Sequence, residues 1–166
     1  MTGELNVLFI CTGNIFRSMT AEYALKQHLG SGSRVFVHSA GVDAAPHEIV
    51  DFVREYNAGR GVDLGNHEPK QLDAHMLSAA DLAVAMDFSH RDRIERDFGQ
   101  RLPVFNQVAF GKEEALLDVC DVVPDWRNNE AASRAYGFTV MDTIYAGMAG
   151  VADHLTSLGV SPRASE

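Results

Sequence analysis

The N-terminal segment up to Gly30 constrains the fold more than any other part of the chain. Residues 5–10 form a short, almost unbroken apolar run, which is typical of a strand buried on both faces of a sheet. Gly13 and Asn14 interrupt this run, and from Arg17 apolar residues recur at helical spacing until Gly30. A buried strand that leads through a short turn into a helix is the opening of an α/β fold.

The alternation of apolar runs and helical patterns continues along the chain. Further strands are predicted at residues 34–39, 81–86 and 102–105. Helices are expected between Pro46 and Gly59, over 88–98, and as one long C-terminal helix over 138–158. The polar, proline-containing stretch 118–129 is interpreted as a long surface loop. Strands that alternate with helices predict right-handed crossovers and a parallel sheet covered on both faces.

The length and composition indicate one soluble domain. A chain of 166 residues can bury a single core, so we expect one domain over residues 1–158 and a fraying tail over 159–166. Hydrophobic residues make up 46% and charged residues 22%, an ordinary balance for a soluble protein. The first apolar run is too short for a signal peptide or membrane span and has no basic cluster before it. We therefore predict a cytoplasmic location and no membrane insertion.

The charge and the cysteines exclude several other classes. A net charge of −9 argues against nucleic acid or an anionic membrane as the main partner, so an anion-binding site must be a local feature. The two cysteines, Cys11 and Cys120, lie far apart and have neither zinc-ligand spacing nor the pattern of a disulfide framework. We expect no metal and no other cofactor.

The turn after the first strand carries the chemistry. In open α/β sheets ligands bind at the carboxyl ends of strands, and Cys11 lies at such an end. The segment Cys11–Ser18 is a cysteine, five residues, an arginine and a serine. The backbone N–H groups of such a turn can form a cradle for a tetrahedral dianion, here from Thr12, Gly13, Asn14, Ile15, Phe16 and Arg17. Gly13 permits the tight path, and the guanidinium of Arg17 can hold two phosphate oxygens.

Cys11, at the floor of this cradle, is a candidate nucleophile. A free thiol is only a few per cent ionised at neutral pH, but a helix N-terminus and nearby cations favour the thiolate. The thiolate would attack phosphorus in line while the loop N–H groups and Arg17 stabilise the equatorial oxygens. A cysteine after a buried strand can also be a small core residue, and the Cys-x5-Arg spacing alone is a weak pattern. The flanking strand and helix, together with Gly13 and Ser18, favour the nucleophile.

With this loop in view, the chain resembles the low-molecular-weight protein tyrosine phosphatases, and the resemblance spans nearly the whole domain. Its opening signature is specific. The matching segments are Val7–Asn14, Arg17-Ser18, Ala21-Glu22, Ser39-Ala40-Gly41, Gly61-Val62-Asp63, His67, Lys70-Gln71-Leu72, Asp81–Asp87 and Val123-Pro124-Asp125.

The resemblance implies a three-layer α/β sandwich with a central four-stranded parallel sheet, and a two-step mechanism without metal. Cys11 would form a phosphocysteine while an aspartate of a late loop protonates the leaving oxygen and then activates water. That aspartate corresponds best to Asp125, with Asp118 and Asp121 as nearby alternatives.

The family also has a hydrogen-bonded network that holds the loop and tunes the thiolate. Its members correspond here to Asn14, Ser18, Ser39 and His67. Plainer interpretations exist: Ser18 as a helix cap, Ser39 as the end of a strand and His67 as a surface histidine. Asp87 also matches the family, and we interpret it as a solvated turn residue.

Three departures from the family pattern bear on the substrate. Asp125 is followed by Trp126 rather than by proline, which leaves the acid loop less fixed, although Trp126 can form one wall of an aromatic pocket. Residues 42–46 offer no aromatic side chain to the pocket mouth. Phe16 stands where many members have a second cysteine, so Cys11 should be less protected from over-oxidation. The expected substrate is a phosphotyrosine-containing protein or a small aryl phosphate.

Two other functions stay open at this point. An arsenate reductase on the same fold would need further thiols, and only Cys120 remains, beside the predicted acid loop. A phosphopeptide-binding module without catalysis is compatible with the altered acid loop, but the intact pair of Cys11 and Arg17 speaks against it.

Overall fold

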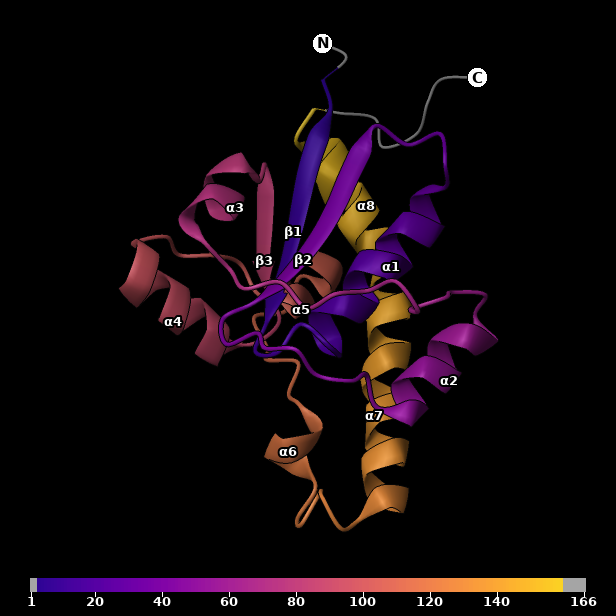
Figure 1. Ribbon diagram of the computed structural model, residues 1–166. Coiled ribbons are helices and arrows are strands. Elements are labelled where there is room, and N and C mark those ends of the chain that lie inside the picture. Colours follow the sequence, from indigo (N-terminus) through magenta and orange to yellow (C-terminus); the bar gives the residue numbers. More distant parts are fainter. Residues whose placement is uncertain (1–2, 160–166) are drawn as a thin grey trace.

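The computed structural model describes residues 3–159 and is built around a short parallel sheet (Figure 1). Strand β1 (Leu5–Cys11) lies at its centre, between β2 (Val35–Gly41) and β3 (Leu82–Ala85), in the order β2-β1-β3. In the register of β1 and β2, Leu5 lies opposite Val35 at one end and Cys11 lies opposite Gly41 at the other. The carboxyl ends of these two strands therefore meet at one edge, which places Cys11 beside Gly41.

The sheet has three strands in the described residues, and this corrects the prediction of four. Where the fourth strand was expected, a single parallel bridge joins Ala85 to Val104, and the Ala85 N–H donates to the Pro103 carbonyl at 3.0 Å. Pro103 has no N–H with which to continue a ladder. Helix α5 (Phe105–Phe110) then begins at once, so the chain leaves the sheet edge after one contact.

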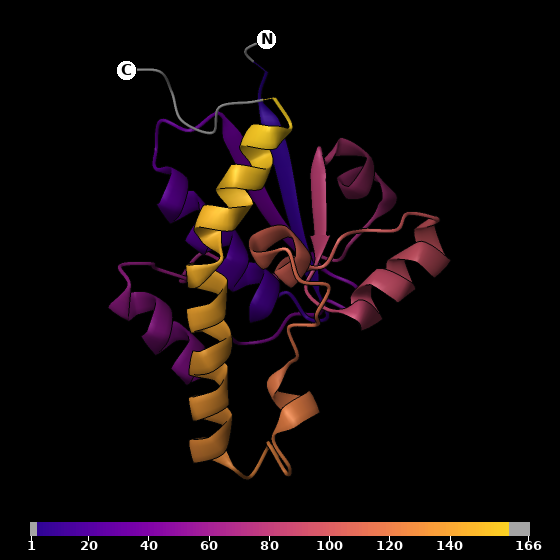
Figure 2. The same cartoon turned by 180° about the vertical axis from the view of Figure 1, so that it is seen from behind.

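Helices cover both faces, so the three-layer arrangement is confirmed (Figures 1 and 2). One layer contains α1 (Arg17–Leu29), α5, α7 (Glu130–Ala146) and α8 (Met148–Ser157), with α2 (Asp51–Gly59) packed on α7. The other contains α3 (Ala74–Ala79) and α4 (Phe88–Phe98). The sheet has one hydrophobic core on each face, and successive residues of β1 point into them in turn. Val7 and Phe9 pack in the core under the larger helical layer, and Leu8 and Ile10 pack in the core under α3 and α4.

The C-terminal helical pattern is two helices, not one. Helix α7 ends at Ala146 and α8 begins at Met148, with Gly147 between them. This junction packs closely on α5, because a Cβ on Gly147 would lie 2.9 Å from the Phe105 ring and one on Gly150 would lie 1.9 Å from the carbonyl oxygen of Ala109. Helical periodicity continues through this junction, so the sequence pattern contains no sign of it.

The stretch 118–129 contains a short helix, α6 (Val119–Val122), within the predicted loop. The predicted tail lies outside the described residues except for Gly159. None of the helices between residues 3 and 159 combines the length and apolar character that a bilayer crossing requires.

Candidate active site

The turn between β1 and α1 is closed tightly on itself. Asn14 has a φ of 57°, in the left-handed region that asparagine tolerates better than most residues. Gly41 of β2 supports the turn from the side, because a Cβ there would lie 2.3 Å from the Thr12 carbonyl oxygen. The neighbouring strand therefore needs glycine at this position for the loop to adopt its path.

Cys11 lies at the floor of the turn with only 3% of its surface exposed. Its Sγ is 2.9 Å from the Ser18 Oγ, and the Asn14 side-chain amide donates to that oxygen at 3.0 Å. The Ser18 oxygen accepts from Asn14, so its single proton has two possible acceptors, the Cys11 sulfur at 2.9 Å and the Ala40 carbonyl oxygen at 3.3 Å, of which the sulfur is the nearer. A hydroxyl that donates to sulfur stabilises a thiolate relative to a thiol.

The other predicted supporting residues also contact Asn14, Ser39 through the side-chain amide and His67 through the backbone carbonyl. Asn14 Nδ2 also donates to the Ser39 Oγ at 2.8 Å, and the His67 Nε2 lies 2.7 Å from the Asn14 carbonyl oxygen. Burial lowers the pKa of His67, and the hydrogen bond to Asn14 offsets this only in part. A neutral His67 therefore donates its Nε2 proton to that carbonyl. The structure thus brings Asn14, Ser18, Ser39 and His67 together around the loop.

Glu22 completes this network, and the sequence analysis assigned it no role. It is 3% exposed, accepts the Ser39 hydroxyl proton and pairs with Lys26 Nζ at 2.6 Å. The sequence did contain a sign of this role. Glu22 follows Ser18 by four residues, so the two side chains lie on the same face of the helix, and Ser18 was already predicted to support the loop.

Both terminal nitrogens of the Arg17 guanidinium have partners, and only its Nε has none. Its Nη1 donates to Asp87 Oδ2 at 2.6 Å and to the Leu116 carbonyl at 2.7 Å, and its Nη2 lies 3.0 Å from Asp118 Oδ2. The side chain is 2% exposed, yet its Nε has no hydrogen-bond partner. Burial alone would lower the pKa of Arg17, but the negative groups of Asp118, Cys11 and Asp87 raise it above its ordinary value.

Asp87 is buried, and the interpretation as a solvated turn residue is wrong. It is 4% exposed and caps α4 by accepting the N–H groups of Ser89 and His90. Burial would raise the pKa of Asp87, but its interactions with His90, Ser89 and Arg17 lower it below the ordinary value. Asp87 is therefore the buried anion that holds Arg17, a contact across 70 residues that no local pattern indicates.

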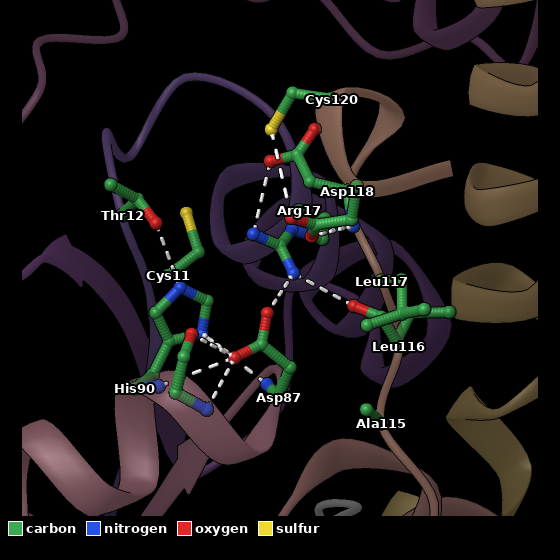
Figure 3. Close-up of polar contacts among 12 residues, drawn as sticks. Cys11, Thr12, Arg17, Asp87, His90, Ala115, Leu116, Leu117, Asp118 and Cys120 are labelled. Atoms are coloured by element: carbon green, nitrogen blue, oxygen red, sulfur yellow. Dashed lines mark hydrogen bonds and ion pairs between the residues drawn. The ribbon is translucent and has the colours of Figure 1, made fainter. Parts of the chain in front are cut away.

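His90 connects this anchor to the nucleophile loop (Figure 3). Burial, with repulsion from Arg17, lowers the pKa of His90 to about 4, so the ring is neutral near pH 7. Its Nδ1 accepts the Asp87 N–H at 3.3 Å, so the proton resides on Nε2, which lies 2.9 Å from the Thr12 Oγ1. The Thr12 hydroxyl oxygen therefore accepts a hydrogen bond from His90 Nε2, and the Thr12 hydroxyl proton can be donated to a different acceptor.

A cavity of about 650 Å³ opens beside the loop, between α2, α7 and the segment 118–129. The residues that decide its character are Gly13, Phe16, Phe52, Asp118, Cys120 and Trp126. Trp126 thus lies where an aromatic wall was predicted. Phe16 is buried against Phe52, with ring centroids 6.2 Å apart.

Two of the three candidate acids, Asp118 and Asp125, differ in position. Asp118 lines the cavity and contacts Arg17, whereas Asp125 is not among the lining residues. Asp125 has a φ of 50°, and its carboxylate accepts from Asn128 Nδ2 at 2.9 Å. Within residues 3–159 no group of three His, Cys, Asp or Glu side chains could hold a metal ion.

Comparison with known proteins decides the family. The family model described as low molecular weight phosphotyrosine protein phosphatase matches residues 6–136. The chain belongs to this family. A low molecular weight protein-tyrosine-phosphatase of Acinetobacter johnsonii is 30% identical over 139 residues, which cover 73% of this chain and 94% of the relative.

Relatives of this phosphatase carry more than one activity in their names. A protein-arginine-phosphatase of Bacillus subtilis is 34% identical over 98 residues, covering 58% of this chain and 65% of the relative. An arsenate reductase of Bacillus cereus is 34% identical over 96 residues, which cover 57% of this chain and 66% of the relative. A crystal structure of a YwlE mutant from Bacillus subtilis superposes with a TM-score of 0.78 at 25% identity, over 92% of this chain and 99% of that one. The α/β fold and the phosphatase family are thus shown.

Proposed function

We propose that this phosphatase hydrolyses phosphate monoesters on protein side chains through a phosphocysteine at Cys11, with phosphotyrosine as the principal substrate. The observation that carries the proposal is the guanidinium of Arg17. It is buried, anchored by Asp87 and Leu116, and has an Nε without a partner beside the loop. A buried donor left unpaired costs about 1–3 kcal/mol, and a phosphate oxygen would remove that cost.

Arg17 would bind two phosphate oxygens through Nε and Nη2, while Nη1 stays on Asp87. The loop N–H groups from Thr12 to Arg17 would hold the remaining oxygens at the N-terminus of α1. Because Asp87 fixes the guanidinium before substrate arrives, the site needs little reorganisation as charge develops on the phosphoryl group.

The reaction proceeds in two displacements. In the first, the Cys11 thiolate attacks phosphorus, the S–P bond forms, and the ester P–O bond breaks as the leaving oxygen takes a proton from an acid. In the second, a water oxygen attacks phosphorus and gives a proton back to the same residue, the S–P bond breaks, and the products are phosphate and the thiolate. Ser18 and Asn14 support the thiolate at the start and end of the cycle.

Phosphotyrosine fits the aromatic part of the cavity. Phe16, Phe52 and Trp126 line it, and a phenyl ring that enters edge-on or offset would contact such rings favourably. We retain the cytoplasm as the predicted location.

The test is to trap the intermediate. Wild-type enzyme mixed rapidly with p-nitrophenyl phosphate should release a burst of p-nitrophenolate equal to the enzyme present, and quenched protein should carry one phosphate on Cys11 by mass spectrometry. The Cys11→Ser variant should show no burst yet still bind vanadate. Turnover by that variant near the wild-type rate would reject Cys11 as nucleophile. Absence of a burst and of turnover in the wild type would support a binding module instead.

A second substrate, protein phosphoarginine, is favoured by the charge of the cavity. Asp51, Asp118 and Glu130 line it. Of its two arginines, Arg134 is neutralised by a two-bonded pair with Glu55, and Arg127 stacks on Trp126. A phosphoarginine would place a guanidinium against these carboxylates, whereas a phosphotyrosine presents no cation. Comparing kcat/KM for phosphoarginine and phosphotyrosine in one peptide sequence, with Asp51→Asn as the charge variant, separates the two: Asp51→Asn should weaken only the phosphoarginine reaction.

Arsenate reduction is less well supported by the site. A second thiol would have to attack Cys11 after arsenate binds, and Cys120 is the one that lines the cavity. Burial, together with Asp118 and Asp121, raises the pKa of the Cys120 thiol, which reduces the reactive thiolate at neutral pH. Thiol-dependent arsenate reduction at a rate above ester hydrolysis would reverse this preference.

A further inference from the structure

The segment 118–129 carries three aspartates, and among their described contacts only Asp118 pairs with Arg17. Its Oδ1 accepts the N–H of Val119 at 2.6 Å, and its own N–H donates to Asp121 Oδ2 at 3.0 Å. The bond to Val119 holds Oδ1, and the other carboxylate oxygen, Oδ2, lies 3.0 Å from Arg17 Nη2. Figure 3 shows this oxygen on the guanidinium, on the side away from Asp87.

Asp125 and Asp121 are occupied elsewhere. Asp125 follows Pro124, sits at a positive φ and accepts from the exposed Asn128 side chain. Asp121 accepts from the Asp118 backbone N–H and acts electrostatically on His90, and the described contacts of Asp121 and Asp125 do not include Arg17.

We propose that Asp118, and not Asp125, is the general acid and base of this phosphatase. The proposal rests on the phosphocysteine mechanism above. A phosphate dianion that takes the Nε and Nη2 of Arg17 displaces Asp118 Oδ2 from the guanidinium. The carboxylate and the dianion then lie side by side, and two adjacent anions favour the uptake of one shared proton, which Asp118 Oδ2 is placed to hold.

The proton then follows the chemistry. As the Cys11–phosphorus bond forms and the ester bond breaks, Asp118 gives the proton to the leaving oxygen and becomes a carboxylate. In the second displacement it takes a proton from the attacking water, and phosphate leaves from Cys11. Atoms, charge and protons balance, and no co-reactant other than water is required.

A purely structural role for Asp118 makes a different prediction. If Asp118 only held Arg17, its loss would weaken oxyanion binding and slow every ester equally. Asp87 and the Leu116 carbonyl already hold the opposite end of the guanidinium, so we expect Arg17 to stay in place without Asp118.

The experiment compares two esters that differ in leaving group. In phenyl phosphate the departing oxygen needs a proton, whereas the nitro group of p-nitrophenyl phosphate stabilises the departing phenolate. Asp118→Asn should slow phenyl phosphate hydrolysis by about 10²–10⁴, the usual contribution of a general acid. It should slow p-nitrophenyl phosphate much less, flatten the basic limb of the pH profile and leave vanadate inhibition intact. Asp118→Ser, which keeps a helix-capping oxygen, should behave in the same way.

Matched variants make the assignment falsifiable. Asp125→Asn and Asp121→Asn should show no such dependence on leaving group, and Asp153→Asn, exposed on α8, sets the baseline. Equal losses on both esters with weaker vanadate binding would reduce Asp118 to a support for Arg17. A leaving-group-dependent loss in Asp125→Asn or Asp121→Asn would transfer the role to that residue. Absence of both a burst and turnover in the wild type overturns the proposed mechanism itself, and that result is distinct from either.

Discussion

The nucleophile loop and the segment 118–129 face the same cavity but are held in opposite ways. Residues 11–18 are fixed by buried contacts from other elements: Ser39 and Gly41 of β2, His67, and Asp87 at the start of α4. In the segment 118–129 most polar contacts are local and exposed, such as Asn128 to Asp125 and Asp118 to Asp121. We infer that residues 11–18 form a rigid wall of the cavity that binds the phosphoryl group. The segment 118–129 forms an adaptable wall that can adjust to the leaving group.

Arg17 offers the strongest test of the rigid wall. Arg17→Lys keeps the charge but loses the planar fork, so one amine cannot contact Asp87, Leu116 and two phosphate oxygens together. We expect kcat/KM for p-nitrophenyl phosphate to fall by about 10³–10⁵, the range for an arginine that stabilises a transferring phosphoryl group. Arg101→Lys, in an exposed pair with Glu95, is the control. A loss confined to KM would mean that Arg17 binds substrate without stabilising the transition state.

His90 makes the rigid wall sensitive to pH. The folded state holds this ring neutral against Asp87, Arg17, Asp121 and Thr12, with the pKa lowered from 6.5 to about 4. A depressed histidine pKa means that the unfolded chain binds the extra proton first, so stability is full above about pH 6.5 and falls as the pH drops toward 4. The shift corresponds to a loss on the order of 3 kcal/mol.

The variant His90→Gln removes this titration. Urea unfolding from pH 7.5 to pH 4 should show a smaller loss of stability in the variant than in the wild type. His47→Gln, which changes an exposed histidine, should follow the wild type. Parallel curves for His90→Gln and the wild type would show that protonation of His90 is not what destabilises the folded state in acid.

Asn14 and Asn128 are the same residue type in the two regions, and they sharpen the comparison. Asn14 is fully buried and satisfies Ser18, Ser39 and the Lys70 N–H, so alanine would leave buried polar groups unpaired and strain a positive φ. Asn14→Ala should lower the free energy of unfolding by about 1–3 kcal/mol and reduce kcat. Asn128→Ala, with one exposed partner, should change stability by less than about 0.5 kcal/mol. Similar losses in both variants would remove the distinction between the walls.

What the sequence could predict depends on how far apart the partners are. The strand, turn and helix around Cys11 and Arg17 are local, and their residue types and spacing were enough to place the nucleophile at a strand end. Asp87 and His90 were missed because they reach the loop across 70 and 78 residues, and nothing near either one marks it as a partner. Long-range members such as Ser39 and His67 could be named only from the family resemblance.

The errors in the fold have local physical causes. An apolar run over 102–105 indicates a strand, but Pro103 cannot donate to a ladder and Phe105 starts a helix. The C-terminal periodicity continues through Gly147, where the two helices meet and where contact with α5 leaves no room for a Cβ. Asp125 was favoured because Val123-Pro124-Asp125 resembles the start of the family's acid loop, and the assignment of the acid stays a prediction.

Trp126 provides the smallest and most specific test of the adaptable wall. Its ring is 37% exposed, lines the cavity and carries the Arg127 guanidinium at 4.5 Å, so it can contact an aryl group without touching the phosphate. An aromatic contact contributes about 0.5–1.5 kcal/mol, so Trp126→Ala should raise KM for phosphotyrosine peptides by about two- to tenfold. Because the ring does not act on the phosphoryl group, kcat should hold, and a small alkyl phosphate should show no change in either constant. If KM rises equally for the alkyl phosphate, the tryptophan shapes the segment 118–129 as a whole and is not a wall for the substrate ring. If kcat falls for aryl esters alone, the ring sets the position of the leaving oxygen relative to the acid, and the two walls are coupled more closely than their separate contacts imply.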